Sequence, residues 1–494
     1  MDFKVQNGPL SELAADVVVI PVFENESLES DVLKSLDELT NGLISTIVGT
    51  DEMHGKSSDT AYVHVGDGLK TRRLLLVGAG IEEKFATRTA RNLAGTAARI
   101  ARKKGATSLA FVQRGGLDPK TFAKCIAEGA LIGLYEPDTY KTEGKTEQTV
   151  TQIIVNTSEA ELPAAEQGLA LGNIVGEATN FTRMLVNEPG MQLPPRKLAE
   201  HAEQVAAQYG LEVDILDEAR MAEFGMGALL GVSRGSDEEA KMIVLTYTPE
   251  NAAEGTETIA LIGKGLTFDA GGLSLKTSEG MEKMKYDMAG GASVIGAMRA
   301  IAQLKPRVKV LGIVPSSENL PSGRALKPGD VLTSMAGKTI EVLNTDAEGR
   351  LILADALAYA QHLGAQKMVD LATLTGAISI ALGTVYCGLF TSNQELADQV
   401  LAAGKNADEK FWQLPMDAEY GELIKSDIAD LKNIGGKYAG SITAAYFLKE
   451  FAGDTPWVHL DIAGVGWNQS TKPYLAKGPS GFSVRTLVEW VMAQ

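Results

Sequence analysis

Charged side chains follow two apolar runs of the sequence, one at Thr258–Gly263 and one at 340–343. In open α/β sheets, functional groups gather at the carboxyl ends of strands, so we expect these side chains to lie together. Carboxylate oxygens are the ligands that hard divalent cations prefer, and two ions about 3.5–4 Å apart need several carboxylates, some of them bridging. The charged residues in question are Lys264, Asp269, Lys276, Asp287, Asp346 and Glu348.

Each of these acids has a simpler interpretation when it is taken alone. Asp346 or Asp330 could cap a helix, and Glu348 could be solvated. Asp346 and Glu348 are two positions apart, however, so in an extended segment both side chains point to one face. Glycines beside the acids also allow the backbone to approach closely. The complete set therefore favours a metal site.

Two other chemical motifs fail on their spacing. A phosphate-binding loop ending at Gly263-Lys264 needs glycine at 258 and Ser or Thr at 265, but the sequence has Thr258 and Gly265. None of the five histidines belongs to an H-E-x-x-H motif, so a zinc protease site of that type is excluded.

A serine hydrolase is a further alternative. Residues 231–235 match G-x-S-x-G around Ser233, and His459 with Asp461 could complete a triad. Such a serine must follow a long buried strand and open a helix. Only a three-residue apolar run precedes this segment. The serine-hydrolase interpretation is therefore disfavoured.

Composition restricts the class of protein. The chain has 494 residues, 45% hydrophobic and 22% charged, which is typical of a soluble globular protein of two or three domains. The formal net charge of −17 disfavours a broad phosphate-binding face, so nucleic acid is not an expected partner.

Other features indicate a cytoplasmic location without membrane contact. Cys125 and Cys387 cannot build a disulfide framework, which favours a reducing compartment, and no secretory signal is visible near Met1. The uncharged stretch 371–394 is long enough to span a bilayer. Its glycines and threonines favour a buried strand, a loop and a short helix instead.

Alternating strand and helix patterns predict the fold class. We expect an N-terminal α/β domain (1–160), a connecting helix (161–190) and a C-terminal α/β catalytic domain (191–494) with a mixed central sheet flanked by helices. Predicted strands are 17–22, 74–78, 108–112, 242–248, 258–263, 308–314, 340–343, 367–371 and 458–462. Predicted helices are 89–104, 164–185, 195–209, 291–303 and 351–362.

The octapeptide at 344–351 (NTDAEGRL) resembles the signature of the leucyl aminopeptidase family. Further segments that resemble the family pattern in order are 264–265, 268–273, 275–276, 284–292, 372–377 and 460–464. Met191 departs from the pattern, which usually has a small polar residue there. The resemblance implies a metal-dependent aminopeptidase that removes leucine and other N-terminal residues from peptides.

The resemblance also implies two divalent metal ions, Mn²⁺ or Zn²⁺, in each subunit. One ion would be held by Asp269, Asp346 and Glu348. The other would be held by Lys264, Asp269, Asp287 and Glu348, so that Asp269 and Glu348 bridge the pair. As a ligand Lys264 must be a neutral amine, which requires a pKa well below the usual ~10.4.

Catalytic residues, substrate residues and assembly follow from the same resemblance. Lys276 and Arg350 match the two catalytic positions, with bicarbonate expected at Arg350. The residues implied in substrate binding are Met284, Asn344, Thr373, Leu374, Gly376 and Ala463. Similar enzymes form homohexamers, so we expect one here. Two alternatives stay open: a DNA-binding regulator, with or without peptidase activity, and a two-metal phosphoesterase.

Overall fold

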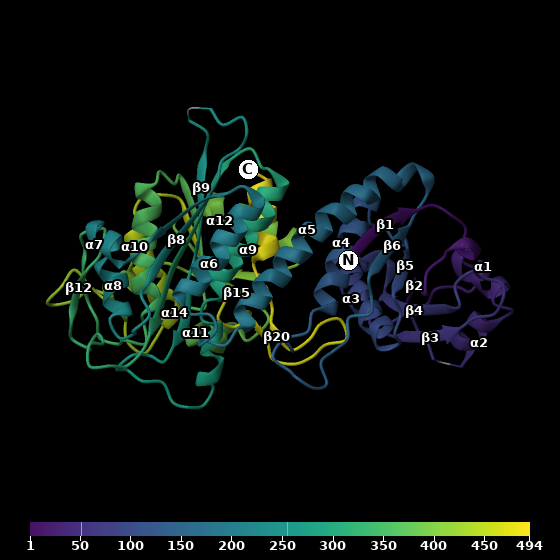
Figure 1. Cartoon of the computed structure of the whole chain (residues 1–494), viewed down its shortest axis with the longest axis horizontal. Helices are drawn as coiled ribbons and strands as arrows, with labels where there is room; N and C mark the ends of the chain where they lie inside the picture. Colours follow the sequence, from purple (N-terminus) through teal and green to yellow (C-terminus); the bar gives the residue numbers. More distant parts are fainter. Residues whose placement is uncertain (51, 254) are drawn as a thin grey trace. The chain divides into compact units, whose positions relative to one another are not determined.

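The computed structural model describes residues 1–50, 52–253 and 255–494, which divide into two units. The first consists of Met1–Asn180 and Gln469–Lys477, and the second of Phe181–Asn468 and Gly478–Gln494. Helix α5 (Leu162–Asn187) runs from the first into the second (Figure 1). Both units are α/β structures, as predicted. No helix in the described residues is long and apolar enough to cross a membrane.

The first unit is built on a six-stranded sheet of order β1-β6-β5-β2-β4-β3, parallel except for the β3–β4 pair. Separate apolar clusters cover its two faces. Its strands are β1 (Asp2–Gln6), β2 (Val17–Phe23), β3 (Thr60–His64), β4 (Arg73–Gly80), β5 (Ser108–Val112) and β6 (Gln152–Asn156). Its other helices are α1 (Asp31–Leu39), α2 (Leu43–Gly49), α3 (Thr87–Lys103) and α4 (Pro119–Leu134).

A nine-stranded mixed sheet forms the second unit, with the order β16-β15-β18-β14-β9-β11-β8-β7 and β10 paired with β11. Its central strands are parallel and buried on both faces, which is usual for parallel sheets. The strands are β7 (Glu212–Leu216), β8 (Lys241–Tyr247), β9 (Thr258–Gly263), β10 (Gly265–Asp269), β11 (Lys309–Asn319), β14 (Lys367–Ala372), β15 (Cys387–Thr391), β16 (Phe411–Gln413) and β18 (Trp457–Asp461).

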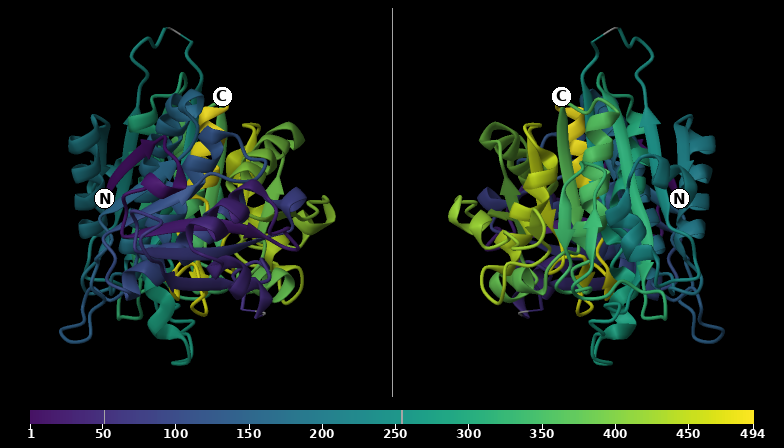
Figure 2. Two further views of the ribbon diagram at one scale, coloured as in Figure 1. Left: turned by 90° about the vertical axis from the view of Figure 1, so that its right-hand side faces the viewer. Right: turned by 90° about the vertical axis from the view of Figure 1, so that its left-hand side faces the viewer.

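Helices pack on both faces of this sheet. On one face α8 and α14 lie against α10, and their apolar side chains share a core with β9, β11 and β14. On the other, α6 and α15 lie against α9 (Figure 2, with α15 in yellow). The helices are α6 (Pro195–Tyr209), α7 (Glu218–Glu223), α8 (Gly227–Ser233), α9 (Ala289–Leu304), α10 (Gly349–His362), α11 (Gly376–Leu382), α12 (Gln394–Ala407), α13 (Glu419–Glu422), α14 (Gly440–Ala452) and α15 (Val484–Met492).

Three of the predicted elements have the observed bounds: β5, β9 and α6. Proline at the first helical position of α6 and left-handed Gly210 after its end explain why its limits are legible in the sequence. The uncharged stretch 371–394 contains the end of β14, the short helix α11 and the strand β15. It is thus a strand, loop and helix of the second unit, as predicted.

The strand predicted at 340–343 does not belong to the central sheet. The observed strand β13 (Thr339–Glu341) belongs to a separate three-stranded sheet with β12 (Val331–Thr333) and β17 (Leu431–Lys432). The chain then turns at 345–346, so the segment carrying Asp346 is not extended. A fourth sheet pairs β19 (Trp467–Asn468) with β20 (Gly478–Pro479).

Candidate active site

Lys264 lies in a buried position between β9 and β10. Its backbone N–H donates to the carbonyl of Leu371 on β14, which holds it beside the central strands. Its ammonium lies 2.6 Å from Oδ2 of Asp287 and 2.8 Å from Oε1 of Glu348. Burial alone lowers the pKa of Lys264, but the carboxylates of Asp287, Glu348 and Asp269 outweigh it and raise the pKa above its usual value. The expected low pKa therefore does not follow from the side chains alone.

Lys276 occupies a second, more exposed position on the same acidic cluster. Its Nζ lies 2.7 Å from Oδ2 of Asp269 and 2.5 Å from Oδ1 of Asp346. The side chain is 23% exposed, against 3% for Lys264. Burial lowers the pKa of Lys276, and the two carboxylates raise it by more, so its ammonium is stabilised.

Three carboxylates converge at this point. Asp269, Asp346 and Glu348 each place one oxygen within 4.8 Å of the others. Asp287 joins them through Lys264 and accepts a 2.7 Å hydrogen bond from Oγ1 of Thr373. Burial raises the pKa of Asp269, and the carboxylates of Glu348 and Asp287 raise it further. Four acids face two lysines here, so the side chains alone leave an excess of negative charge. Such a set of oxygen donors fits hard divalent cations.

Asn319, at the end of β11, is a site residue that the sequence did not reveal. Its Nδ2 donates to Oδ1 of Asp269 at 2.9 Å and lies 3.4 Å from Oε2 of Glu348. The predicted strand stopped at 314, before Pro315 and the polar residues 316–319, whereas β11 continues through them. No local pattern in the sequence marks Asn319, because its role depends on the distant carboxylates that the fold brings beside it.

Arg350 is the second residue of α10, which starts at Gly349 directly after Glu348. Its Nη1 donates to the backbone carbonyl of Asn433 at 2.7 Å. Its buried Nε makes no hydrogen bond to the part of the chain that the structure describes. Burial lowers the pKa of Arg350 to about 10, so the guanidinium is still charged at neutral pH.

Five of the six predicted substrate residues come from three segments, and the sixth, Asn344, lies in a fourth. Met284 lies in a short 3₁₀ helix, Met281–Tyr286, that leads to Asp287. Oδ1 of buried Asp461 accepts hydrogen bonds from the backbone N–H groups of Leu374 and Ala463, both at 3.2 Å. Asp461 thus joins two of the three segments.

Gly376 and Asn344 are held by contacts within their own segments. Gly376 starts α11 immediately after Thr375, whose side chain caps the helix. Asn344 differs from the others, because its Oδ1 accepts from the N–H of Asp346 at 2.9 Å and so supports the loop that carries Asp346 and Glu348.

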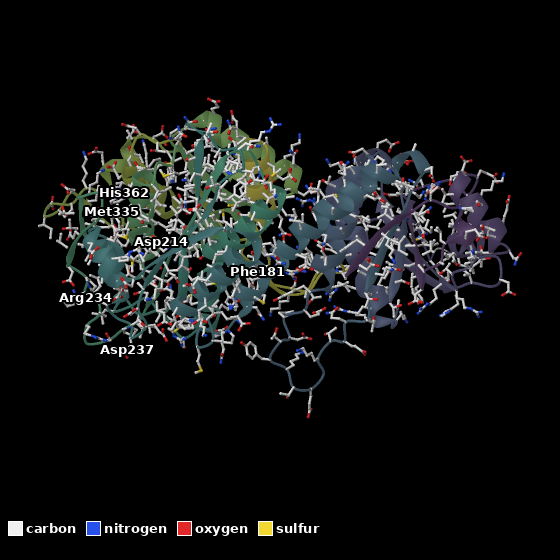
Figure 3. All side chains as sticks on the ribbon, turned by 45° about the horizontal axis from the view of Figure 1, so that its top comes forward. Phe181, Asp214, Arg234, Asp237, Met335 and His362 are labelled. Atoms are coloured by element: carbon white, nitrogen blue, oxygen red, sulfur yellow. The ribbon has the colours of Figure 1, made fainter. Side chains whose placement is uncertain are left out.

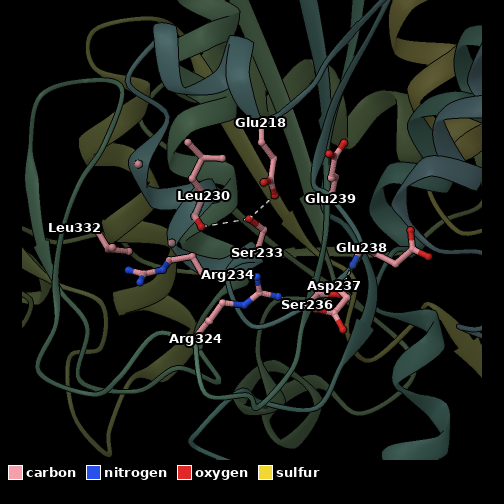
Figure 4. A pocket seen from close by; sticks show the side chains of 12 residues that line it. Glu218, Leu230, Ser233, Arg234, Ser236, Asp237, Glu238, Glu239, Arg324 and Leu332 are labelled. Carbon is pink, nitrogen blue, oxygen red and sulfur yellow. Dashed lines mark hydrogen bonds and ion pairs between the residues drawn. The ribbon is translucent and has the colours of Figure 1, made fainter.

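The structure contradicts the serine-hydrolase alternative. Ser233 ends helix α8 and donates to Oε1 of Glu218 at 2.9 Å, beside an open pocket of about 530 Å³ (Figure 4). His459 is fully buried and its Nδ1 lies 2.6 Å from Asp370. No Ser–His pair of that motif therefore forms among the described residues.

His362, labelled in Figure 3, stacks on Tyr359 at the end of α10.

Comparison with known proteins gives matches along almost the whole chain. The model for the catalytic domain of the cytosol aminopeptidase family matches residues 180–488, and the model for its N-terminal domain matches 19–144. A probable cytosol aminopeptidase of Acidobacterium capsulatum is 49% identical over 99% of this chain and 95% of the relative. A second probable cytosol aminopeptidase, from Solibacter usitatus, is 47% identical over 100% of this chain and 99% of the relative.

Solved structures agree with these matches. A mutant of tomato leucine aminopeptidase superposes with a TM-score of 0.91 at 35% identity, covering 100% of this chain and 97% of that one. The bottromycin maturation enzyme BotP in complex with Mn gives a TM-score of 0.86 at 34% identity, covering 97% and 99%. With both domain models, full-length relatives and the whole fold in agreement, this chain belongs to the cytosol aminopeptidase family.

Proposed function

We propose that this aminopeptidase hydrolyses the N-terminal residue, leucine among others, from peptides at a two-metal centre. The observation that carries the proposal is the convergence of Asp269, Asp346 and Glu348 within 4.8 Å. Bound Mn²⁺ or Zn²⁺ would supply Lewis acidity and lower the pKa of water at the site. The Mn complex of BotP supports manganese as one candidate.

Five side chains would hold the two ions. Asp269 and Glu348 would be shared by both ions, and each accepts a hydrogen bond from Nδ2 of Asn319 that helps to orient it. Asp346 completes one site. Lys264 and Asp287, which are 2.6 Å apart and buried, complete the other.

Lys276 and Arg350 act on the substrate and its protons. The Lys276 ammonium is the partly exposed charged donor of the site, and it meets the oxyanion that develops on the scissile carbonyl. Arg350 cannot serve as a base, because a guanidinium does not lose its proton at neutral pH. Its buried Nε–H suits a planar anion, and we propose a bicarbonate there as the proton shuttle.

The first side chain of the peptide would occupy a pocket formed by Met284, Thr373, Leu374, Gly376 and Ala463, with Asn344 beside it. Asp461 supports this arrangement by fixing the backbone of two of these segments. We further propose a cytoplasmic homohexamer, and the names of the relatives support the location. Equilibrium sedimentation tests the assembly, which a strictly monomeric and fully active enzyme would refute.

Substitution of a bridging acid tests the metal centre. Asp269→Asn should reduce turnover of Leu-p-nitroanilide by about a thousandfold or more and lower metal content, because an amide weakens both ions together. Asp237→Asn is the matched control, since that side chain is 97% exposed and its ion pair is with Arg324, far from any proposed ligand in sequence. Wild-type turnover by metal-replete Asp269→Asn protein would refute the assignment.

A further inference from the structure

Asn433 lies beside the loop that carries Asp346 and Glu348, although some 90 residues separate them in sequence. It follows β17, whose parallel pairing with β13 brings it next to the start of that loop. The residue is fully buried, at 0% exposed. A polar side chain at such a position must find its partners within the protein.

The carboxamide of Asn433 uses its whole hydrogen-bonding capacity on the loop. Its Oδ1 accepts from the N–H groups of Leu343 and Asn344, at 2.9 and 3.3 Å. Its Nδ2 donates to the carbonyls of Asn344 and Ala347, at 2.7 and 3.4 Å. An amide has two acceptor lone pairs and two donor hydrogens, so no other side chain of this size offers the same set.

The backbone of Asn433 extends the contact on both sides. Its carbonyl accepts the 2.7 Å hydrogen bond from Nη1 of Arg350. Its N–H donates to the carbonyl of Glu341, the last residue of β13, at 2.9 Å. One buried residue thus contacts the segment before the loop, the loop itself and the arginine after it.

The loop has few alternatives for these hydrogen bonds. It connects β13 to α10 without regular secondary structure and turns at 345–346. Backbone groups in such a segment need side-chain partners when they are buried, and an unpaired one costs about 1–3 kcal/mol. Four of the loop's backbone groups depend on one amide.

We propose that Asn433 is a positioning residue that holds Asp346, Glu348 and Arg350 in one arrangement toward the site. It does not contact the acids themselves but fixes the backbone from which they project. The inference rests on the proposed metal centre. It implies that loss of the amide weakens metal binding and displaces the guanidinium, while the pocket residues Thr373, Leu374 and Ala463 are untouched.

Isosteric substitution tests this role. Asn433→Asp keeps the size and the acceptors but turns oxygen toward the carbonyls of Asn344 and Ala347. Asn433→Ser is smaller and uncharged, and it supplies one hydroxyl in place of the carboxamide. Asn393→Asp is the control, because Asn393 caps α12 through its Oδ1 and aspartate caps equally well. Mn²⁺ affinity is measured at pH 8 by the paramagnetic resonance of free Mn²⁺, and kcat and KM on Leu-p-nitroanilide per metal-loaded chain.

We expect the Mn²⁺ dissociation constant of Asn433→Asp to rise about tenfold or more, with a smaller rise for Asn433→Ser. At saturating Mn²⁺ kcat should fall while KM changes less than about twofold, and Asn393→Asp should match the wild type. If Asn433→Asp does not fold, the same measurements on Asn433→Ser test the inference. Variants with lower thermal stability but wild-type Mn²⁺ affinity and kcat would overturn the role of Asn433 and leave the proposed function standing. A wild-type protein that binds neither Mn²⁺ nor Zn²⁺ would overturn the proposed function, and the inference with it.

Discussion

Gly349 leaves the space that the side chain of Lys264 occupies. A Cβ built on Gly349 would lie 2.7 Å from both Cε and Nζ of Lys264, closer than real Cβ contacts come. The same Nζ lies 2.8 Å from Oε1 of Glu348, the residue before the glycine. The absence of a side chain at position 349 therefore allows the lysine to reach the acids.

Gly349→Ala should displace the Lys264 amine and lower kcat/KM about tenfold or more, which corresponds to about 1.4 kcal/mol. Alanine has a higher helix propensity than glycine, and position 349 is the first of α10. The backbone of the helix should therefore not be destabilised by this substitution. Gly323→Ala is the control, because a Cβ there meets nothing within 4 Å. Equal kinetics for the two variants would show that the close approach has no functional role.

The two lysines should differ in their response to arginine. Lys264→Arg should lose one ion, because a ligand must be a neutral amine and arginine stays charged. Bound cations would have to reverse the upward shift in the pKa of Lys264 that the carboxylates cause. Lys276→Arg should keep both ions and lower kcat, because the charged donor is displaced. Metal counting by atomic emission, beside kinetics, would contradict this division if Lys264→Arg kept both ions.

Gly376→Ala should change substrate preference without harming the fold. A Cβ on Gly376 meets no atom within 4 Å, so a methyl group enters open space. If that space is the pocket for the first side chain, kcat/KM for Leu-p-nitroanilide should fall about tenfold relative to Ala-p-nitroanilide, since one methylene of misfit costs about 1–3 kcal/mol. An unchanged ratio of the two substrates would place Gly376 outside the pocket.

Asp355 should make stability depend on pH. Burial raises its pKa to about 7, against hydrogen bonds from the N–H groups of Leu229 and Met335 that favour the charged form. The folded state then holds the proton more tightly than the unfolded chain, whose pKa is about 4. This stabilisation is complete below about pH 4 and is lost as the pH rises through about 7.

Asp355→Asn removes that titration. The melting temperature of the wild type minus that of the variant should therefore shrink between pH 5.5 and pH 8. Scanning calorimetry at both values checks this expectation. A difference that stays constant with pH would mean that the buried carboxyl does not titrate in this range.

The sequence predicted the acids and lysines that the structure brings together, because these residues stand in short motifs of specific spacing. Its geometric argument was partly wrong: Asp346 and Glu348 meet Asp269 through a turn after β13, not from an extended end of the central sheet. Asn319 and Asn433 could not be found in this way. Their roles depend on which distant backbone and carboxylate groups the fold brings beside them, and no local pattern encodes that.

The number of ions needed for activity tests the central claim most directly. Metal-depleted protein is titrated with Mn²⁺ while bound metal and hydrolysis of Leu-p-nitroanilide are measured in the same samples. The acidic cluster predicts an inactive depleted protein whose activity is complete only when two ions are bound to each chain. Full hydrolysis in excess chelator, or maximal activity with one bound ion, would contradict the two-metal centre.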